Sequence, residues 1–315
     1  MSEHFADRMA SAVRRSGSRV CVGLDPALEG VARALGAAPD VSDPEAVAEA
    51  IWRFNERILE AVQPYCAVVK PQSAFYEVWG APGIEALGRT IRRAREMALL
   101  CILDAKRNDI ASTADAYAQA YLADGPLAAD ALTVNPYLGS DGIRPFVEHA
   151  RSRGRGIFAL LRTSNPSSNE IQNVRLSDGA LLYEHVGDLV AAWGADSLGA
   201  CGYSDVGAVV GATFPAELAA LRERLRQTWF LIPGYGRQGG TAADVAGGFD
   251  EEGLGAIVNS SSGIIFAGAK EPEKNFAEAA GNAAREMRDA LETALEARQR
   301  RCRHWPGAAW YRSTS

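Results

Sequence analysis

The chain of 315 residues lacks the signs of a secreted or membrane-bound protein. Its five cysteines stand far apart and form no C-x-x-C pair, so we expect free thiols in a reducing compartment. No stretch of about 18 apolar residues occurs, and no basic flank precedes an apolar segment near the N-terminus. We therefore expect no membrane span and no secretion signal, and we predict a cytoplasmic protein.

An excess of positive charge is also absent. The formal net charge is -6 and the sequence pI is about 5.4, so the chain has no global attraction for nucleic acid or anionic membranes. We expect no partner of either kind, and a phosphate ligand would have to be held by a local pocket. Hydrophobic residues make up 47% of the sequence, which is enough for one large core, and we expect a single domain.

What the sequence does have is a series of eight short apolar runs separated by amphipathic segments. Apolar residues at three- and four-residue spacing predict helices over Pro44–Val62, Gly83–Met97 and Ala216–Gln227. Strands that alternate with helices form parallel sheets, and eight is the strand number of the (β/α)8 TIM barrel. The runs are Val20–Leu24, Ala67–Lys70, Leu99–Leu103, Ala131–Val134, Ile157–Leu161, Val206–Val210, Trp229–Ile232 and Ala256–Val258.

An open doubly wound sheet is the structural alternative to the barrel. It would normally carry a glycine-rich fingerprint after the first strand, whereas the first run here continues as Val22–Pro26. We therefore predict an α/β fold with a single (β/α)8 barrel domain over residues 1–315. Within it we expect an N-terminal helix over 1–19, a barrel core over 20–267, and a C-terminal helix and tail over 268–315.

The clearest chemical motif is Asp104–Asp109, in which two carboxylates stand around Lys106 directly after an apolar run. On a helix surface such a string would be a solvated cluster of ion pairs with little energetic meaning. The preceding run, Leu99–Leu103, is instead typical of a strand buried on both faces. Charges at the carboxyl end of such a strand face the active site of an α/β barrel, so we predict an enzyme.

Polar residues follow the other runs as well. Asp25 and Lys70 end the first two, and with Asp104 they suggest a network of alternating charge that fixes Lys106. The seventh run leads into a loop with four glycines, 233–241, whose backbone N–H groups could hold an anion. The eighth leads into a donor-rich loop, 259–263. Barrels often bind phosphate between these two loops, so we expect a phosphorylated small molecule as ligand.

In these motifs the chain resembles orotidine 5'-phosphate decarboxylase, specifically its longer bacterial type, from about residue 20 to residue 267. Six motifs occur in the order of that family. They are Gly23–Pro26, Val69–Gln72, Asp104–Ile110, Thr163–Pro166, Val210–Thr213 and Pro233–Gly240.

The resemblance implies a decarboxylation of orotidine 5'-monophosphate to uridine 5'-monophosphate without metal or cofactor, in a homodimer with its active sites at the interface. It implies that Lys106 protonates C6 of the pyrimidine, and that Asp104 and Asp109 flank the substrate carboxylate. Asp109 would come from the partner subunit, and Lys70 would join the charge chain.

The resemblance also assigns substrate-binding residues. Asp25 and Thr113 would bind ribose hydroxyls, Ser164 would hold the pyrimidine, and Gln238 would bridge the base and the phosphate. The remaining predicted binding residues belong to the two phosphate loops; they are Arg237, Gly239, Ser261 and Ser262.

One residue departs from the family. Ser262 stands where an arginine normally grips the phosphate with a charge-assisted pair. Arg237, on the opposing loop, stands where the family usually has a small residue, so its guanidinium could reach the same anion. The alternatives are a paralogue acting on a modified or differently phosphorylated nucleotide, a magnesium-dependent barrel enzyme for sugar phosphates, and a non-catalytic nucleotide-binding protein.

Overall fold

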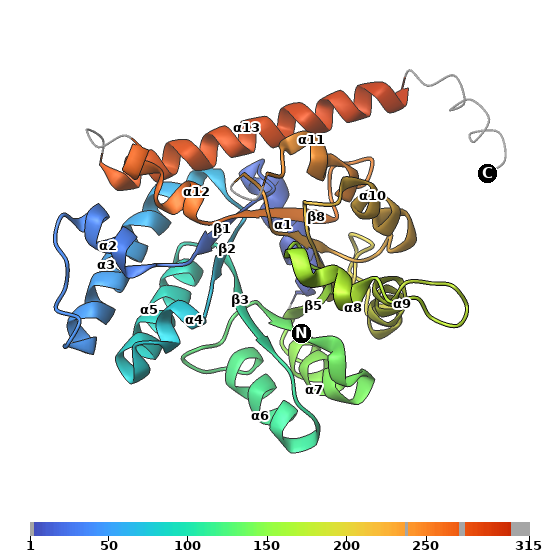
Figure 1. Cartoon of the computed structure of the whole chain (residues 1–315), viewed down its shortest axis with the longest axis horizontal. Coiled ribbons are helices and arrows are strands. Elements are labelled where there is room, and N and C mark those ends of the chain that lie inside the picture. The colour runs from blue at the N-terminus through green and yellow to red at the C-terminus, as the bar shows by residue number, and fades with distance from the viewer. Residues whose placement is uncertain (1–2, 237–238, 271–274, 304–315) are drawn as a thin grey trace.

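Eight parallel strands close into a barrel in chain order in a computed structural model, which describes residues 3–236, 239–270 and 275–303 (Figure 1). The predicted (β/α)8 TIM barrel is therefore confirmed. The strands are β1 (Val20–Leu24), β2 (Val68–Pro71), β3 (Leu100–Arg107), β4 (Ala131–Val134), β5 (Gly156–Arg162), β6 (Val206–Val210), β7 (Phe230–Ile232) and β8 (Ala256–Ser260).

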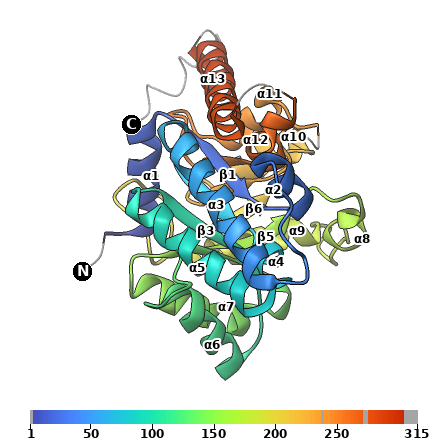
Figure 2. The ribbon, with the colours of Figure 1, turned by 90° about the vertical axis from the view of Figure 1, so that its left-hand side faces the viewer.

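The helices surround the barrel, and the long α13 runs along one side of the molecule (Figures 1 and 2). Each of the three helices predicted from apolar spacing is present, with ends that differ by no more than three residues. The helices are α1 (Phe5–Ser16), α2 (Leu28–Leu35), α3 (Pro44–Val62), α4 (Ala74–Glu77), α5 (Gly80–Glu96), α6 (Ala111–Leu122), α7 (Ser140–Arg151), α8 (Asn169–Gln172), α9 (Leu182–Gly194), α10 (Pro215–Arg224), α11 (Ala242–Val245), α12 (Ser262–Ile265) and α13 (Phe276–Arg303).

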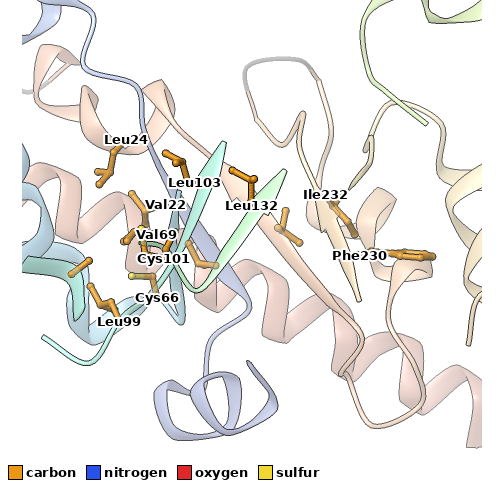
Figure 3. Packing of buried hydrophobic residues seen from close by; sticks show 14 of the residues in the cluster. Val22, Leu24, Cys66, Val69, Leu99, Cys101, Leu103, Leu132, Phe230 and Ile232 are labelled. Atoms are coloured by element: carbon orange, nitrogen blue, oxygen red, sulfur yellow. The ribbon is translucent and has the colours of Figure 1, made fainter. Parts of the chain in front are cut away.

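The strands divide their side chains between two cores. Alternate residues such as Val22, Val69 and Leu103 point outward and pack under the helices, in the larger apolar cluster (Figure 3). The residues between them, such as Cys21 and Ile102, point into the barrel and belong to a second cluster. The barrel interior is thus a packed core rather than a pore.

Helix α1 closes the amino-terminal end of the barrel. Its residues Met9 and Val13 are buried in the inner cluster together with Phe5. The Phe5 ring packs edge-on against Phe158, and a Cβ on Gly156, at the start of β5, would lie 2.3 Å from the Phe5 ring. With this end covered, the mouth of the barrel lies at the carboxyl ends of the strands.

The alternation along each strand decides which polar groups reach the mouth. Lys70 follows the inward-facing Val68 by two residues, and Asp104 follows the inward-facing Ile102 by two. Thr133 stands in the same relation to Ala131 on β4. Three neighbouring strands therefore direct one polar side chain each into the same opening.

Strand β3 runs further than the apolar pattern predicts. The charged motif was expected at the junction with the exit loop, but the strand continues through Arg107. The register between β3 and β4 shifts between Leu103 and Arg107, which marks a bulge. Strand β8 likewise extends to Ser260. Among the described residues, no helix combines the length and apolar character needed to cross a membrane.

Candidate active site

A chain of ion pairs occupies the mouth of the barrel. The Asp104 carboxylate accepts a hydrogen bond from Lys70 Nζ at 2.7 Å through Oδ2, and one from Lys106 Nζ at 2.6 Å through Oδ1. Lys70 and Asp104 are buried, with 4% and 7% of their surface exposed, whereas Lys106 is exposed to the cavity described below. The buried pair thus fixes one end of the chain, and the exposed ammonium group faces the ligand space.

The ionisation of the pair follows from its surroundings. Burial disfavours the charged form of Asp104, but the ammonium groups of Lys70 and Lys106 outweigh that effect and hold the pKa of the carboxyl well below its ordinary value. Burial also opposes the charge on Lys70, but Asp104 and Asp25 raise its pKa above the ordinary value. Both groups therefore stay charged near neutral pH.

Asp25 extends the alternation of charge to a fourth residue. It follows β1 directly, and its negative charge acts on Lys70. Its Oδ1 atom is buried and has no hydrogen-bond partner among the residues that the structure describes. A buried carboxylate oxygen without a partner is costly, so this atom is poised to accept a hydrogen bond from a ligand.

The larger cavity at the mouth has a volume of about 940 Å³. Lys70, Asp104 and Lys106 form its charged end, and Ser164, on the loop after β5, lines it as well. The remaining wall is largely apolar and includes Leu160, Leu182, Val186, Val209 and Leu231. The cavity therefore combines a charged end with a largely apolar wall.

A second cavity, of about 590 Å³, lies beyond the carboxyl ends of β1 and β8, beside α2 and α12. It is lined by Asp25, Ser261 and Ser262, which the sequence predicted as binding residues, and by Arg33 of α2. Ser261 Oγ is buried without a hydrogen-bond partner within the described part of the chain. Carboxylate and hydroxyl oxygens of this kind can bind the hydroxyl groups of a ligand.

The glycine loop after β7 folds tightly, as its composition predicts. Gly234, Gly236 and Gly239 have φ angles of 96°, 76° and 94°, which favour glycine. A Cβ on Gly240 would lie 2.8 Å from the Cβ of Ala212, so only glycine fits there without a shift. Two predicted binding residues, Arg237 and Gln238, lie outside the described residues.

Asp109 and Thr113 lie away from the charge chain of their own subunit. Asp109 Oδ1 accepts a hydrogen bond from the backbone N–H of Ile110, just before α6. Thr113 is exposed on the first turn of that helix. Neither is among the described residues that line the cavity around Lys106.

Sequence reasoning missed Arg162, the last residue of β5. This arginine is 1% exposed and pairs with Glu217 of α10 at 2.6 Å. It donates to Ser168 and Asn169 in the segment after Ser164 and stacks on the Phe214 ring at 3.9 Å. An arginine directly before the T-S-N-P motif was the available signal, but its burial is set by partners far along the chain.

The fold is a (β/α)8 barrel, and its mouth holds a buried chain of alternating charges. Buried ion pairs at the carboxyl ends of barrel strands are typical of an enzyme. The profile of the family described as "Orotidine 5'-phosphate decarboxylase / HUMPS family" matches residues 18–279. The chain belongs to this family.

Relatives from bacteria match nearly the whole chain. Orotidine 5'-phosphate decarboxylase of Rhodopirellula baltica is 42% identical over 299 residues, which cover 91% of this chain and 99% of the relative. The enzyme of the same name from Clostridium perfringens is 40% identical, covering 92% and 99%. The chain is accordingly a carboxy-lyase.

Solved structures agree with the fold. The structure of Leishmania donovani OMP decarboxylase has a TM-score of 0.72 at 32% identity and covers 94% of this chain and 100% of its own. A structure from Streptomyces avermitilis has a TM-score of 0.81 at 36% identity, with coverages of 94% and 98%.

Proposed function

We propose that the chain decarboxylates orotidine 5'-monophosphate to uridine 5'-monophosphate, with Lys106 as the proton donor. The bond between C6 and the carboxylate breaks, carbon dioxide leaves, and the electron pair stays on C6. Lys106 Nζ then gives one proton to C6 and recovers it from solvent. The observation that supports this role most directly is the placement of Lys106 Nζ, 2.6 Å from Asp104 Oδ1 at the edge of the larger cavity.

Asp104 acts on the substrate through its charge. At about 4 Å and an effective dielectric of about 20, two carboxylates repel each other by roughly 4 kcal/mol. Loss of carbon dioxide removes this repulsion, and the fixed ammonium group of Lys106 stabilises the carbanion that is left. Either contribution requires Asp104 to stay ionised, and the two lysines beside it hold its pKa low.

The substrate would extend from one cavity to the other. Ser164 would hold the pyrimidine in the larger cavity, and Asp25 would accept a hydrogen bond from a ribose hydroxyl through Oδ1, which has no hydrogen-bond partner among the described residues. Ser261, Ser262 and Gly239 would bind the phosphate. Gln238 would bridge base and phosphate, and Arg237 would supply the cation that position 262 lacks.

The active enzyme is a homodimer in this proposal, and the partner subunit contributes Asp109 and Thr113. Support comes from the position of both residues outside their own subunit's cavity, on the segment that leads into α6. Large apolar side chains are also exposed around the mouth: Ile110 at 51%, Tyr137 at 78% and Leu138 at 43%. A second copy of the chain would cover them.

We further expect the enzyme to work in the cytoplasm on free nucleotide, with no nucleic-acid or membrane partner. No cofactor takes part in the proposed reaction, because Lys106 and Asp104 supply the charge and the proton. Excess EDTA should leave the rate unchanged. A loss of turnover that magnesium restores would instead favour the sugar-phosphate chemistry of a metal-dependent barrel enzyme.

The decisive assay follows the loss of the ultraviolet absorbance of orotidine 5'-monophosphate, for the unmodified chain and for Ser262→Arg side by side. We expect robust turnover by the unmodified chain, little improved by the arginine. Arg237→Ala should then raise the Michaelis constant about tenfold or more, as loss of a charge-assisted phosphate contact does.

Feeble turnover that Ser262→Arg rescues would contradict the assignment of substrate. A paralogue acting on a modified or differently phosphorylated nucleotide would then be the better description. That alternative is not favoured, because relatives about 40% identical over nearly the whole chain carry the decarboxylase name.

A further inference from the structure

We propose that Thr133, in the middle of β4, is a positioning residue that holds Asp104 and Lys106 in their reactive arrangement. This inference rests on the proposed roles of those two residues and adds a third, neutral group to the site. Thr133 is 1% exposed, and its side chain points into the barrel mouth beside the charge chain.

The bulge in β3 explains why a hydroxyl is needed at position 133 of β4. Leu103 pairs with Leu132 and Arg107 pairs with Val134, so the three residues 104–106 stand opposite Thr133 alone. A bulge of this kind takes backbone N–H groups out of the strand ladder. The N–H groups of Ala105 and Lys106 both donate to Thr133 Oγ1 at 3.0 Å instead.

The same hydroxyl reaches the carboxylate. Thr133 Oγ1 donates to Asp104 Oδ1 at 2.9 Å, the oxygen that also accepts from Lys106 Nζ. A hydroxyl has one proton to donate and two lone pairs to accept with, and all three are used here. One side chain therefore fixes the backbone of Lys106 and the orientation of the Asp104 carboxylate together.

Lys106 needs such a restraint because its backbone is strained. Its φ angle is 49°, in the left-handed region that residues with a Cβ rarely occupy. A strained conformation persists only where its surroundings enforce it, and such positions cluster at functional sites. The Thr133 contact to the Lys106 N–H is one such restraint, and the ion pair with Asp104 is the other.

The test compares Thr133→Val, which keeps the shape and removes the hydroxyl, with Thr133→Ser, which keeps the hydroxyl. Thr90→Val is the matched control, because Thr90 is also fully buried and its hydroxyl also makes hydrogen bonds. It donates to the carbonyl of Ala86 in the same helix, α5, and accepts from Asn55 of α3. Each variant is assayed for kcat and KM with orotidine 5'-monophosphate, and its melting temperature is measured.

We expect Thr133→Val to lower kcat about 10- to 100-fold with KM changed less than about twofold, and Thr133→Ser to recover most of the loss. Thr90→Val should lower the melting temperature by a similar amount and leave kcat near that of the unmodified chain. Equal kcat values for Thr133→Val and Thr90→Val would overturn the proposal, as would a loss confined to KM.

A crystal structure of Thr133→Val separates this proposal from the proposed function. We expect the φ angle of Lys106 to leave the left-handed region, or the contact between Lys106 Nζ and Asp104 Oδ1 to lengthen. An unchanged Asp104 and Lys106 would refute the positioning role whatever the activity. An unmodified chain that does not decarboxylate the substrate would refute the proposed function, and the crystal structure would still decide the role of Thr133.

Discussion

Lys106 is the residue on which the site depends most, since it combines a strained backbone, an ion pair and a side chain exposed to the cavity. Its neighbours Asp104 and Lys70 are buried and can make few new contacts if one member is lost. Single substitutions of these three residues should therefore distinguish effects on the chemical step from effects on substrate binding and on the stability of the fold.

Removal of the proton donor should abolish turnover without abolishing binding. Lys106→Ala is expected to lower kcat by about 10³-fold or more, because proton transfer by a placed group contributes factors of that order. The affinity for uridine 5'-monophosphate, measured by calorimetry, should stay within about tenfold. Lys106→Arg, which keeps the charge but misplaces the donor, should be nearly as inactive; substantial activity in it would contradict the role of Lys106 as general acid.

Asp104→Asn should show how much the negative charge of Asp104 contributes to the stability of the fold. Because the pKa of Asp104 lies below its ordinary value of 3.8, the ionised carboxylate stabilises the fold above that pH, and the contribution is lost as the pH falls through the lowered pKa. The variant leaves Lys70 buried without its partner, so we expect a loss of about 3 kcal/mol in the free energy of unfolding at neutral pH.

Urea unfolding of the unmodified chain and Asp104→Asn at neutral pH and at pH values well below 3.8 checks this, because the difference should shrink as the pH falls toward the lowered pKa. A difference that stays constant, or grows as the pH falls, would show that Asp104 does not stabilise the fold through its charge.

At the scale of elements, the segment between β5 and α9 is the part of the site that depends on contacts between distant elements. Arg162 joins this segment to Glu217 and Phe214, and a Cβ on Gly211 would lie 2.9 Å from the Cβ of Ser164. The loop that carries Ser164 is therefore held against the end of β6.

Arg162→Lys should disturb this loop and raise KM for orotidine 5'-monophosphate about tenfold, because an ammonium group cannot reproduce the several donors of a guanidinium. Arg222→Lys is the matched control, since Arg222 is 4% exposed and also stacks on a ring, Phe230, at 3.9 Å. It donates to backbone carbonyls such as that of Gly255, at the opposite end of the barrel.

Both arginine variants should lower the melting temperature by several degrees, because each leaves buried acceptors unpaired. Only Arg162→Lys should change KM. If the two variants changed KM equally, Arg162 would be a stabilising residue with no particular effect on the loop of Ser164.

At the scale of the whole molecule, the described chain has a site that lacks Asp109 and a rim of exposed apolar residues beside it. The proposed dimer accounts for both features, and a mixing experiment distinguishes it from a site completed within one chain. Lys106→Ala and Asp109→Ala should each be inactive alone. When they are mixed and allowed to exchange subunits, half of the dimers are hybrids.

Each hybrid dimer has one site with Lys106 from one subunit and Asp109 from the other, so the mixture should regain about one quarter of the unmodified activity. A mixture that stays inactive while mass spectrometry shows hybrid dimers would place Asp109 in the site of its own chain. Size-exclusion chromatography of each variant serves as the control for assembly.

Much of the barrel could be predicted because its signals are local. Every predicted strand run overlaps a strand of the barrel. Because alternate residues of a strand point to opposite faces, the position of a residue in its run decides whether it faces inward. The contact of Lys70 and Lys106 with Asp104 was predicted from strand ends alone, and the structure confirms it. The division of the chain into segments and the binding roles in the phosphate loops stay predictions.

Other features could not be read from local patterns. The extension of β3 through charged residues, and the bulge within it, depend on the register with β4, which no spacing in the β3 segment encodes. Thr133 lies in an apolar run and looks like any strand threonine, and the burial of Arg162 requires partners up to 55 residues away.

The sequence by itself determined the class of fold, the inward and outward faces of each strand, and the residue types at the carboxyl ends, because propensity and periodicity act within a few residues. The tertiary structure alone decided which of those residues meet, how the bulge strains Lys106 and where Thr133 supports it. These depend on register and closure between strands that are distant in sequence, and such geometry exists only once the barrel has closed.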